Sequence, residues 1–387
     1  MVTELRAPAD TRRVSAAVAA AGVSSFALLY APQPVLPQLA TAFRLDPGSA
    51  SLAIGVATTA LALAVLPLAA LSEFVDRRKI IVCSVVASAV LGLLLPLAPS
   101  YPVLLVMRAL QGVAIAGFPG VAAAYLADLV GAARLPAAVG AMIAGNSVGG
   151  MLGRLGAGFA ADPLGWQGAL LVVAAVSLAC ALYAAATLPA AASGAPAHRD
   201  PVRVRLGGRL LVPYTVGLLG MGSFVAIYNA AGFRLTAPPI GLAPAVASLV
   251  FLAYATGAAS SAAAGRLVDR LGRAPALMAA LATTVAGAAL TLPDALPVVA
   301  AGFAVLTAGF FAAHAVASAW VAAEAPPRAR GRAAGVYLLC YYLGSGAGGT
   351  IGSTVYGHAG WTWLVALTAG WLLLALLAVL FSRRRRH

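Results

Sequence analysis

Arg108 and Gln111 stand inside a long apolar stretch, in the run Arg108-Ala-Leu-Gln111-Gly112. At this spacing their side chains share one face of a helix. A guanidinium stays charged in a protein and must meet water, a ligand or hydrogen-bond acceptors. We therefore expect Arg108 and Gln111 to line a wet pathway through the protein. The alternative is a structural arginine that backbone carbonyls of the first helix hold in place.

Three further polar side chains lie in apolar stretches. Asn146 stands among glycines, where its amide can line the same pathway or simply join two helices. His314 carries an imidazole that can titrate near physiological pH, and a packed, neutral histidine is the alternative. Arg154 is expected near the outer end of its helix, where a long side chain can reach the interface. We interpret Arg154 as structural.

Acidic residues are missing from the middle of every apolar stretch, and Asp46, Asp162 and Asp294 stand at stretch ends. Proton relays in membranes commonly use a buried carboxylate or histidine, so the usual carboxylate is missing here. The sequence also lacks the paired His, Asp or Glu that an intramembrane enzyme needs. The cysteines, Cys83, Cys180 and Cys340, have no metal-ligand spacing. We expect no enzyme activity, no metal site and no cofactor.

The composition is that of a protein in lipid. Hydrophobic residues make up 62% of the 387 residues, charged residues make up 9%, and the mean hydropathy is +0.95. About a quarter of the residues of a soluble domain are charged, so most of this surface must face lipid. The net charge of +14 is scattered in small clusters rather than gathered in one basic stripe, which argues against nucleic-acid binding.

Twelve apolar stretches approach the roughly 20 residues that a helix needs to cross a bilayer. They lie near residues 15–38, 50–70, 80–98, 101–124, 135–160, 166–188, 210–231, 244–263, 275–293, 296–320, 333–356 and 361–381. Most basic residues fall in alternate loops between them, as at Arg77-Arg78-Lys79. The positive-inside rule then places those loops and both termini in the cytoplasm. We expect an all-α integral membrane protein of 12 transmembrane helices.

The longest polar stretch divides these helices six and six. We predict an N-terminal six-helix bundle over 1–188, a cytoplasmic linker over 189–208, and a C-terminal bundle with a basic cytoplasmic tail over 209–387. The bundles should be pseudo-symmetric, because Gly149-Gly150-Met-Leu-Gly153 recurs as Gly348-Gly349-Thr-Ile-Gly352. Such glycine ridges let helices approach closely, and we expect the two halves to rock on them. Repeats of this kind are typical of transporters, with the substrate site between the halves.

The run Gly265-Arg-Leu267-Val-Asp269-Arg270-Leu-Gly272-Arg273 resembles the G-x-L-x-D-R-x-G-R loop of the major facilitator superfamily. The equivalent loop of the first half is degraded and holds Glu73 in place of the family aspartate, followed by Asp76, Arg77 and Arg78. The resemblance implies a pair of latch loops, in which the acids and arginines pair in one conformational state and separate in the other.

Other runs strengthen this resemblance. Arg108-Ala-Leu-Gln111-Gly112 is similar to the R-x-x-Q-G motif of the superfamily, and Tyr30-Ala-Pro32-Gln33-Pro34 resembles the first helix of its proton-driven efflux members. Further stretches are similar to the YnfM-like bacterial branch. The resemblance implies a substrate and proton pathway lined by Tyr30, Gln33, Arg108, Gln111, Asn146, Phe224, Tyr228, Asn229, His314, Tyr341 and Tyr342.

One departure concerns the G-x8-G-x3-G-P motif, which is frequent in antiporters of the superfamily. Gly140, Gly149 and Gly153 keep its spacing, but Arg154 stands where proline is expected.

We expect a multi-pass secondary active transporter of the bacterial cytoplasmic (inner) membrane that works by alternating access. It should export small organic compounds, drug-like or sugar-like, in exchange for protons; uptake or uniport of a small solute by the same fold is the alternative. The several aromatic residues suit a neutral or weakly cationic substrate. The expected partners are the lipid bilayer, this substrate and protons, and the chain should act as a monomer.

Overall fold

The computed structural model describes residues 11–130, 134–189, 208–326 and 329–384, and within these ranges the chain folds into helices joined by short turns. The predicted linker, 189–208, lies almost wholly outside the described residues, as do the last residues of the predicted basic tail. The first half contains α1 (Thr11–Tyr30), α2 (Leu36–Phe43), α3 (Pro47–Leu71), α4 (Arg77–Leu94), η1 (Leu95–Leu97), α5 (Tyr101–Leu129) and α6 (Leu135–Thr187).

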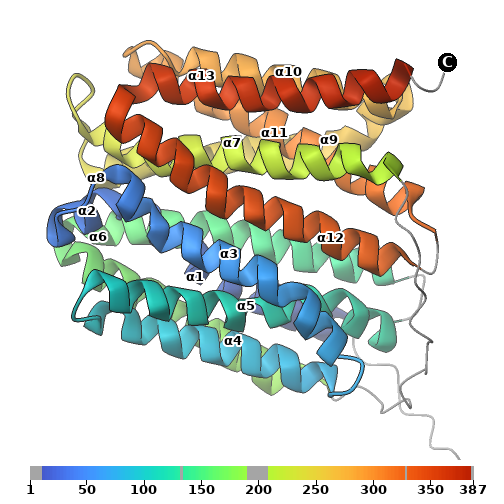
Figure 1. Cartoon of the computed structure of the whole chain (residues 1–387). Helices are drawn as coiled ribbons and strands as arrows, with labels where there is room; N and C mark the ends of the chain where they lie inside the picture. Colours follow the sequence, from blue (N-terminus) through green and yellow to red (C-terminus); the bar gives the residue numbers. More distant parts are fainter. Residues whose placement is uncertain (1–10, 131–133, 190–207, 327–328, 385–387) are drawn as a thin grey trace, which may run out of the picture.

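The second half repeats this order after the linker. It contains η2 (Gly208–Leu210), α7 (Leu211–Thr236), α8 (Pro244–Ser248), η3 (Leu249–Ala253), α9 (Tyr254–Leu271), α10 (Arg273–Leu290), α11 (Leu296–Glu324), α12 (Arg330–Leu343), the π-helical turn η5 (Gly344–Gly348) and α13 (Gly349–Arg384). In Figure 1 the blue-to-green helices of the first half lie below the yellow-to-red helices of the second.

Two helical segments are too long to cross a membrane once. The apolar part of α6 has 51 residues, and the segment from α12 through α13 has 53. Either would be roughly 75–80 Å long, whereas the hydrocarbon core is about 30 Å thick. The chain breaks the helix at Gly165 (φ 65°) and Gly360 (φ 82°), a backbone conformation that glycine adopts without strain. The 10 candidate spans thus become the twelve transmembrane helices that the sequence predicts.

Gly165 lines a pocket with Thr41 of α2 and Pro244 of α8, and Gly360 lines another with Pro47 at the start of α3. Both breaks therefore lie at the end of the molecule that holds α2 and α8 (Figure 1). We call this the α2 end, and the opposite end, where α6 finishes and η2 begins, the linker end. At the α2 end, Asp46 is the N-cap of α3 and accepts a hydrogen bond of 3.0 Å from the backbone N–H of Ser49. A hydrogen bond from the Ser49 hydroxyl, together with this backbone bond, lowers the pKa of the Asp46 carboxyl, as expected where hydrogen bonds favour the charged form.

The glycine ridges pack helices inside each half. A β-carbon at Gly149 of α6 would lie 2.5 Å from the Cα of Val23 in α1. The α6 ridge Gly145, Gly149 and Gly153 meets Ala19, Val23 and Ala27, and the later ridge Gly344, Gly348 and Gly352 meets Leu218, Gly222 and Ala226 of α7. Close packing at these glycines is therefore confirmed. Their expected place between the halves is wrong, because the contacts lie within each bundle.

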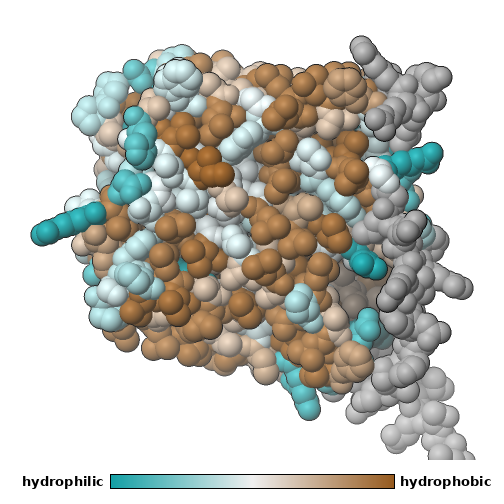
Figure 2. Space-filling view, in the orientation of Figure 1, coloured by the Kyte–Doolittle hydropathy of each residue, from teal (hydrophilic) through white to brown (hydrophobic). Residues whose placement is uncertain are grey.

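Burial along the helices separates lipid-facing from interior spans. In the apolar segment of α1, 61% of the residues are buried, and in the span formed by η2 and α7 the share is 72%. In the spans of α4 and α10 only 39% are buried. Large apolar side chains such as Val106, Val176 and Leu374 are more than half exposed, as a lipid-facing surface requires. Figure 2 shows hydrophobic residues across the middle of this face and hydrophilic residues gathered at its two ends.

The halves meet along two seams. In the first, α3 packs against α12, η5 and α13, with Thr59 against Gly346 of η5. In the second, α6 packs against α8 and η3, and the Asp162 carboxylate accepts a hydrogen bond of 3.3 Å from the backbone N–H of Ala245. This second seam includes Asp162 against Ala245 at the α2 end and, deeper in the molecule, Arg154 against Tyr254. The halves are therefore in direct contact at the α2 end.

The ridge contact makes a testable prediction on one helix. Alanine at Gly149 must push α1 and α6 apart, and such overpacking costs about 1–3 kcal/mol. Gly140, also in α6, has nothing within 4 Å of an added β-carbon, so Gly140→Ala should gain up to about 1 kcal/mol of helix propensity. In detergent, the apparent melting temperature of Gly149→Ala should fall by several degrees while that of Gly140→Ala is equal or higher. Equal melting of both variants would contradict the ridge.

Candidate functional site

The first transmembrane span is broken by its prolines. The Leu28 carbonyl would normally accept a hydrogen bond from residue 32, but Pro32 has no N–H. The Gln33 N–H bonds to the Tyr30 carbonyl instead, at 3.0 Å, so the Leu29 carbonyl also loses its helical partner. Two backbone acceptors are thereby left open in the apolar interior, where an unsatisfied polar group is costly.

Arg108 of α5 fills this gap. Its Nη1 donates to the Leu28 carbonyl at 3.1 Å and its Nη2 to the Leu29 carbonyl at 2.6 Å. Its Nε donates to the Ala53 carbonyl of α3 at 2.7 Å. Nη1 also donates to Gln111 Oε1, and Gln111 Nε2 donates to the Ser88 carbonyl of α4 at 2.9 Å. The arginine therefore ties α1, α3 and α5 together, and through Gln111 it reaches α4.

The energetics favour this clamp. Inserting an arginine at the centre of a membrane helix costs about 2.5–3.5 kcal/mol on insertion scales, whereas one hydrogen bond to a charged group returns about 1.5–3 kcal/mol. Arg108 and Gln111 are both 0% exposed, and every partner named above belongs to the first half. These are the contacts of a structural arginine. A role for Arg108 and Gln111 in the translocation pathway stays a prediction.

A second buried arginine lies between the halves. Arg154 of α6 is 2% exposed, and its Nη1 donates to the Gly150 carbonyl at 2.7 Å. Its guanidinium carbon lies 4.0 Å from the ring centre of Tyr30 and 4.7 Å from that of Tyr254. The interpretation of Arg154 as a residue that snorkels to the interface is wrong, because α8 and η3 pack over the α2 end of α6 and the side chain is buried.

A polar chain leads from Arg154 across the boundary. Arg154 Nε donates to Gln33 Oε1, and Gln33 Nε2 donates to Asn229 Oδ1 of α7 at 2.7 Å. Gln33 and Asn229 are both fully buried. The Asn229 Nδ2 atom is buried with no hydrogen-bond partner among the described residues. Residues far apart in the sequence thus join the two halves through side-chain amides.

Aromatic side chains surround this chain on the side of the second half. Phe224 stacks on Phe310 with ring centres 4.1 Å apart and lies 4.7 Å from Tyr228. The Tyr228 hydroxyl forms a hydrogen bond of 2.6 Å with Thr307. Tyr254 packs edge-on against both Phe224 and Tyr228. The predicted residues Phe224 and Tyr228 therefore belong to one aromatic cluster with residues that the sequence did not single out.

His314 extends this cluster towards the linker end. Its Nδ1 lies 2.8 Å from the Tyr337 hydroxyl, and its ring centre lies 4.7 Å from that of Tyr341. A crevice of about 10 Å³ borders His314, Tyr337 and Tyr341, which is close to the space of one water molecule. Tyr342 is buried and packs edge-on against Tyr341. His314 as a whole residue is half-buried.

Asn146 packs against the first helix. A β-carbon at Gly22 of α1 would lie 2.4 Å from Asn146 Oδ1, so the amide fits where α1 lacks a side chain. That oxygen is buried and has no partner among the described residues. Both interpretations of Asn146, as a helix-joining amide and as a lining residue, remain open.

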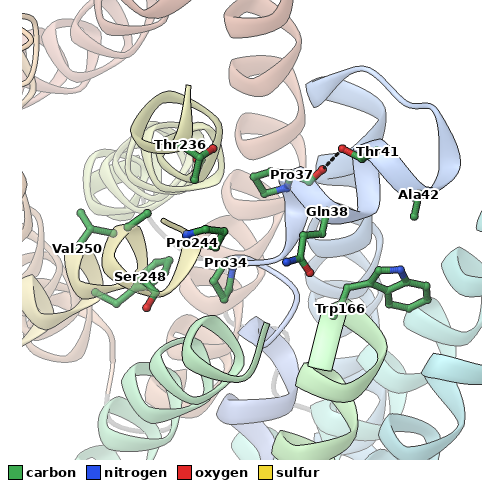
Figure 3. Close-up of a pocket in the computed structure, with 14 residues that line it drawn as sticks. Pro34, Pro37, Gln38, Thr41, Ala42, Trp166, Thr236, Pro244, Ser248 and Val250 are labelled. Carbon is green, nitrogen blue, oxygen red and sulfur yellow. Dashed lines mark hydrogen bonds between the residues drawn. The ribbon is translucent and has the colours of Figure 1, made fainter. Parts of the chain in front are cut away.

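A pocket of about 410 Å³ lies at the α2 end between the halves (Figure 3). In Figure 3, Pro34 and Gln38 from the broken first span face Pro244 and Ser248 of the second half, with Trp166 of α6 at the edge. Of the described residues that line the pocket, none is charged. Phe251 lines it as well and lies 5.4 Å from the Arg154 guanidinium. Phe251 therefore borders both the pocket and the buried arginine.

The predicted latch loops lie at the linker end. In the first half, Arg77 forms an ion pair with Asp128, Arg78 donates to the carbonyls of Leu188 and Ala185, and Asp76 caps α4; Glu73 is exposed.

In the second half, Asp269, Arg270 and Arg273 are exposed and form no ion pair with another described residue. Gly272 ends α9 with φ 82°, and Gly265 has open space around it. Among the described residues, no ion pair joins the latch charges of one half to those of the other, and the switching role of the loops stays a prediction.

The structure brings together only part of the predicted pathway. Tyr30 and Gln33 contact Arg154, and Asn229 joins them through Gln33. Phe224 and Tyr228 pack on Tyr254, which also contacts Arg154. Arg108 and Gln111 lie inside the first half. Sequence reasoning missed Arg154, Phe251, Tyr254 and Tyr337 as members of the site. The signal for Arg154 was present, since an arginine in place of the motif proline needs a reason. Within the described residues, no group of three His, Cys, Asp or Glu side chains could hold a metal ion.

Comparisons with known proteins agree on one family. The family model described as Major Facilitator Superfamily matches residues 18–238 and 217–387. The chain is 36% identical to the inner membrane transport protein YnfM of Escherichia coli over 97% of this chain and 91% of that protein. It is 34% identical to YybF of Bacillus subtilis, named as an uncharacterized MFS-type transporter, over 94% of this chain and 92% of that protein.

Among solved structures, a bacterial homolog of the human lysosomal transporter Spinster, in an inward-facing and occupied conformation, matches with a TM-score of 0.79. The match covers 97% of this chain and 96% of that chain at 16% sequence identity. At this identity the match shows the fold alone.

The clamp at the broken helix predicts a stability defect. Arg108→Ala leaves the carbonyls of Leu28 and Leu29 without donors, and each unsatisfied group costs about 1–3 kcal/mol. We expect the apparent melting temperature of the detergent-purified variant to fall by on the order of 10 °C. The melting temperature of Arg108→Lys should lie between those of Arg108→Ala and the wild type, because one ammonium cannot reproduce the planar fork of donors. If Arg108→Ala melts with the wild type and loses only transport, the residue belongs to the pathway instead.

Proposed function

The chain belongs to the major facilitator superfamily, and we propose that it exports small organic compounds, drug-like or sugar-like, in exchange for protons. The family and the named relatives are membrane transporters rather than enzymes. Export would proceed by alternating access, in which the two halves open in turn to each side of the membrane around one central site.

The observation that carries this proposal is the hydrogen bond between Gln33 and Asn229. It spans 196 residues of sequence, is fully buried, and links the broken first helix to the equivalent helix of the second half. A contact that joins the halves at a buried, polar and aromatic-lined point is what a transporter needs at its substrate site. Substrate that binds there would compete for or replace these side-chain partners.

The arrangement of the seams supports a two-state cycle. The α2 end is closed by α6 against α8 and by Pro37 near Gly232 of α7. If the linker end is cytoplasmic, as the basic residues predict, this closed end faces outward. The separated latch charges would then pair when the linker end closes. The uncharged pocket at the α2 end would receive substrate when the outer seam between Asp162 and Ala245 opens.

Proton coupling is proposed for His314. It lies inside a span, next to the aromatic cluster, with the hydroxyl of Tyr337 on one ring nitrogen and Tyr341 beside it. Arg108 cannot release a proton under physiological conditions, and its donors are engaged by backbone carbonyls and Gln111. The histidine is therefore the better candidate to exchange a proton during the cycle.

Location and assembly follow from the same proposal. We place the protein in the bacterial inner membrane with both termini in the cytoplasm, in line with its basic loops and with the named inner membrane relative. A single copy contains both halves and the bond between them. The chain should therefore transport as a monomer, with the bilayer, its substrate and protons as its partners.

Transport into inverted membrane vesicles tests this function. Respiration acidifies the lumen of such vesicles, so an exporter that exchanges protons should accumulate one or more compounds from a panel of labelled drugs and sugars. An uncoupler should collapse that accumulation. Gln33→Leu, which removes the polar link between the halves, should lower accumulation by about tenfold at unchanged abundance.

A matched control is Thr283→Val, an exposed site on α10 whose hydroxyl bonds only within its own helix; it should transport like the wild type. Entry that only equilibrates the compound across the vesicle membrane, and that the uncoupler does not change, would show uniport and remove proton exchange. No accumulation above vesicles that lack the protein, for any compound, would contradict export.

A further inference from the structure

Arg154 brings a permanent positive charge to the boundary between the halves, and no described acid balances it. The acid of its own helix is Asp162, about two turns away, and that carboxylate is bonded to the backbone N–H of Ala245. The ion pairs that join two described residues include those of Arg77, Arg209 and Arg234. The described residues of the site therefore carry a net positive charge in an apolar environment.

The two buried arginines differ in how fully they are used. Nε, Nη1 and Nη2 of Arg108 all donate hydrogen bonds to described residues. Arg154 uses Nε and Nη1, and its Nη2 donates no hydrogen bond to any described residue. A guanidinium has donors and no acceptor, so this free edge can be satisfied only by an acceptor or by water.

The far end of the polar chain shows the same deficit. Asn229 Oδ1 accepts a hydrogen bond from Gln33. The residue is 0% exposed, and its Nδ2 has no hydrogen-bond partner among the described residues. The Arg154–Gln33–Asn229 chain therefore ends in an unused donor on both sides. An ionised carboxylate offers acceptors only and forms its strongest hydrogen bonds with a guanidinium, often through two parallel bonds.

Flat rings complete the site. Tyr30, Phe251 and Tyr254 lie against the guanidinium from both halves. A β-carbon at Gly150 would lie 3.2 Å from Arg154 Nη1, so this glycine leaves the room in which the guanidinium rests. Tyr254 is half-buried, whereas Tyr30 and Phe251 are buried. Aromatic walls favour a flat apolar body on the ligand.

We propose that the substrate is an organic anion, a carboxylate joined to an aromatic ring, whose carboxylate binds Arg154 and whose ring packs on Tyr30 and Tyr254. The assignment rests on the proposed transport function, since it names the substrate class of the same site. It replaces the neutral or weakly cationic substrate expected from the sequence, because a cation would be repelled. The bound anion neutralises the positive charge of the site before the substrate crosses the membrane.

Binding to purified protein in detergent tests the assignment without a transport step. Three ring systems would be measured by calorimetry, each with three head groups: benzoate, cinnamate and 2-naphthoate, with their amides and their primary amines. At least one carboxylate should bind about tenfold more tightly than its amide, and the amines should not bind. Raising the salt concentration should weaken carboxylate binding only modestly, because buried charges are poorly screened.

Variants then assign the effect to Arg154. Arg154→Gln should lose at least about tenfold in carboxylate affinity with no loss for the amide, and Arg154→Lys should keep part of the preference. Thr283→Val should match the wild type. If Arg154→Gln does not fold, the ratio of carboxylate to amide on the wild type still decides the substrate class.

The outcomes separate the two proposals. If no carboxylate of the panel exceeds its amide, or if Arg154→Gln keeps the preference, the anion assignment is overturned while export can stand. If carboxylates bind through Arg154 but are never accumulated in inverted vesicles, the binding site stands and the export proposal fails.

Discussion

The structure depends on how positive charge is tolerated in an interior that offers almost no counter-charge. Arg108 is tolerated because prolines break the first helix and leave the carbonyls of Leu28 and Leu29 open. The same break frees the segment after Tyr30 to turn, and Gln33 can then reach Asn229 in the other half. One interruption of a helix therefore stabilises the first bundle and also supplies the polar link between the bundles.

The sequence left both a structural and a pathway role open for Arg108, whereas in the structure two different arginines have the contacts that suit these roles. Arg108 has its donors satisfied and no exposed surface, so it holds helices together. Arg154 rests on rings, and cation–π contacts contribute only about 0.5–2 kcal/mol each, against several kcal/mol for removing an ion from water. The second arginine is left with an open donor edge. A charge that the protein itself does not balance is suited to a ligand that does.

The helices could be predicted from the sequence because hydropathy and length fix them. The broken spans at Gly165 and Gly360 were also separable, since each break falls between two predicted stretches. Close helix packing at the glycine ridges was predicted correctly, but sequence spacing does not say which helix a ridge contacts. Arg154 was misjudged because depth was counted from the predicted helix end near residue 160. The helix continues to Gly165, and α8 covers the route to water. The aromatic partners Phe251 and Tyr254 come from η3 and α9, and only tertiary packing places them over that guanidinium.

The central claim is that the seam between α6 and α8 must open for the solute to leave. The most direct measurement is transport by a cysteine-free version that carries Asp162→Cys together with Ala245→Cys, whose native side chain and backbone are 3.3 Å apart. Oxidation or a short cross-linker should stop transport, a reductant should restore it, and Asp162→Cys alone should be insensitive to both. Full transport by the cross-linked protein would contradict alternating access through this seam.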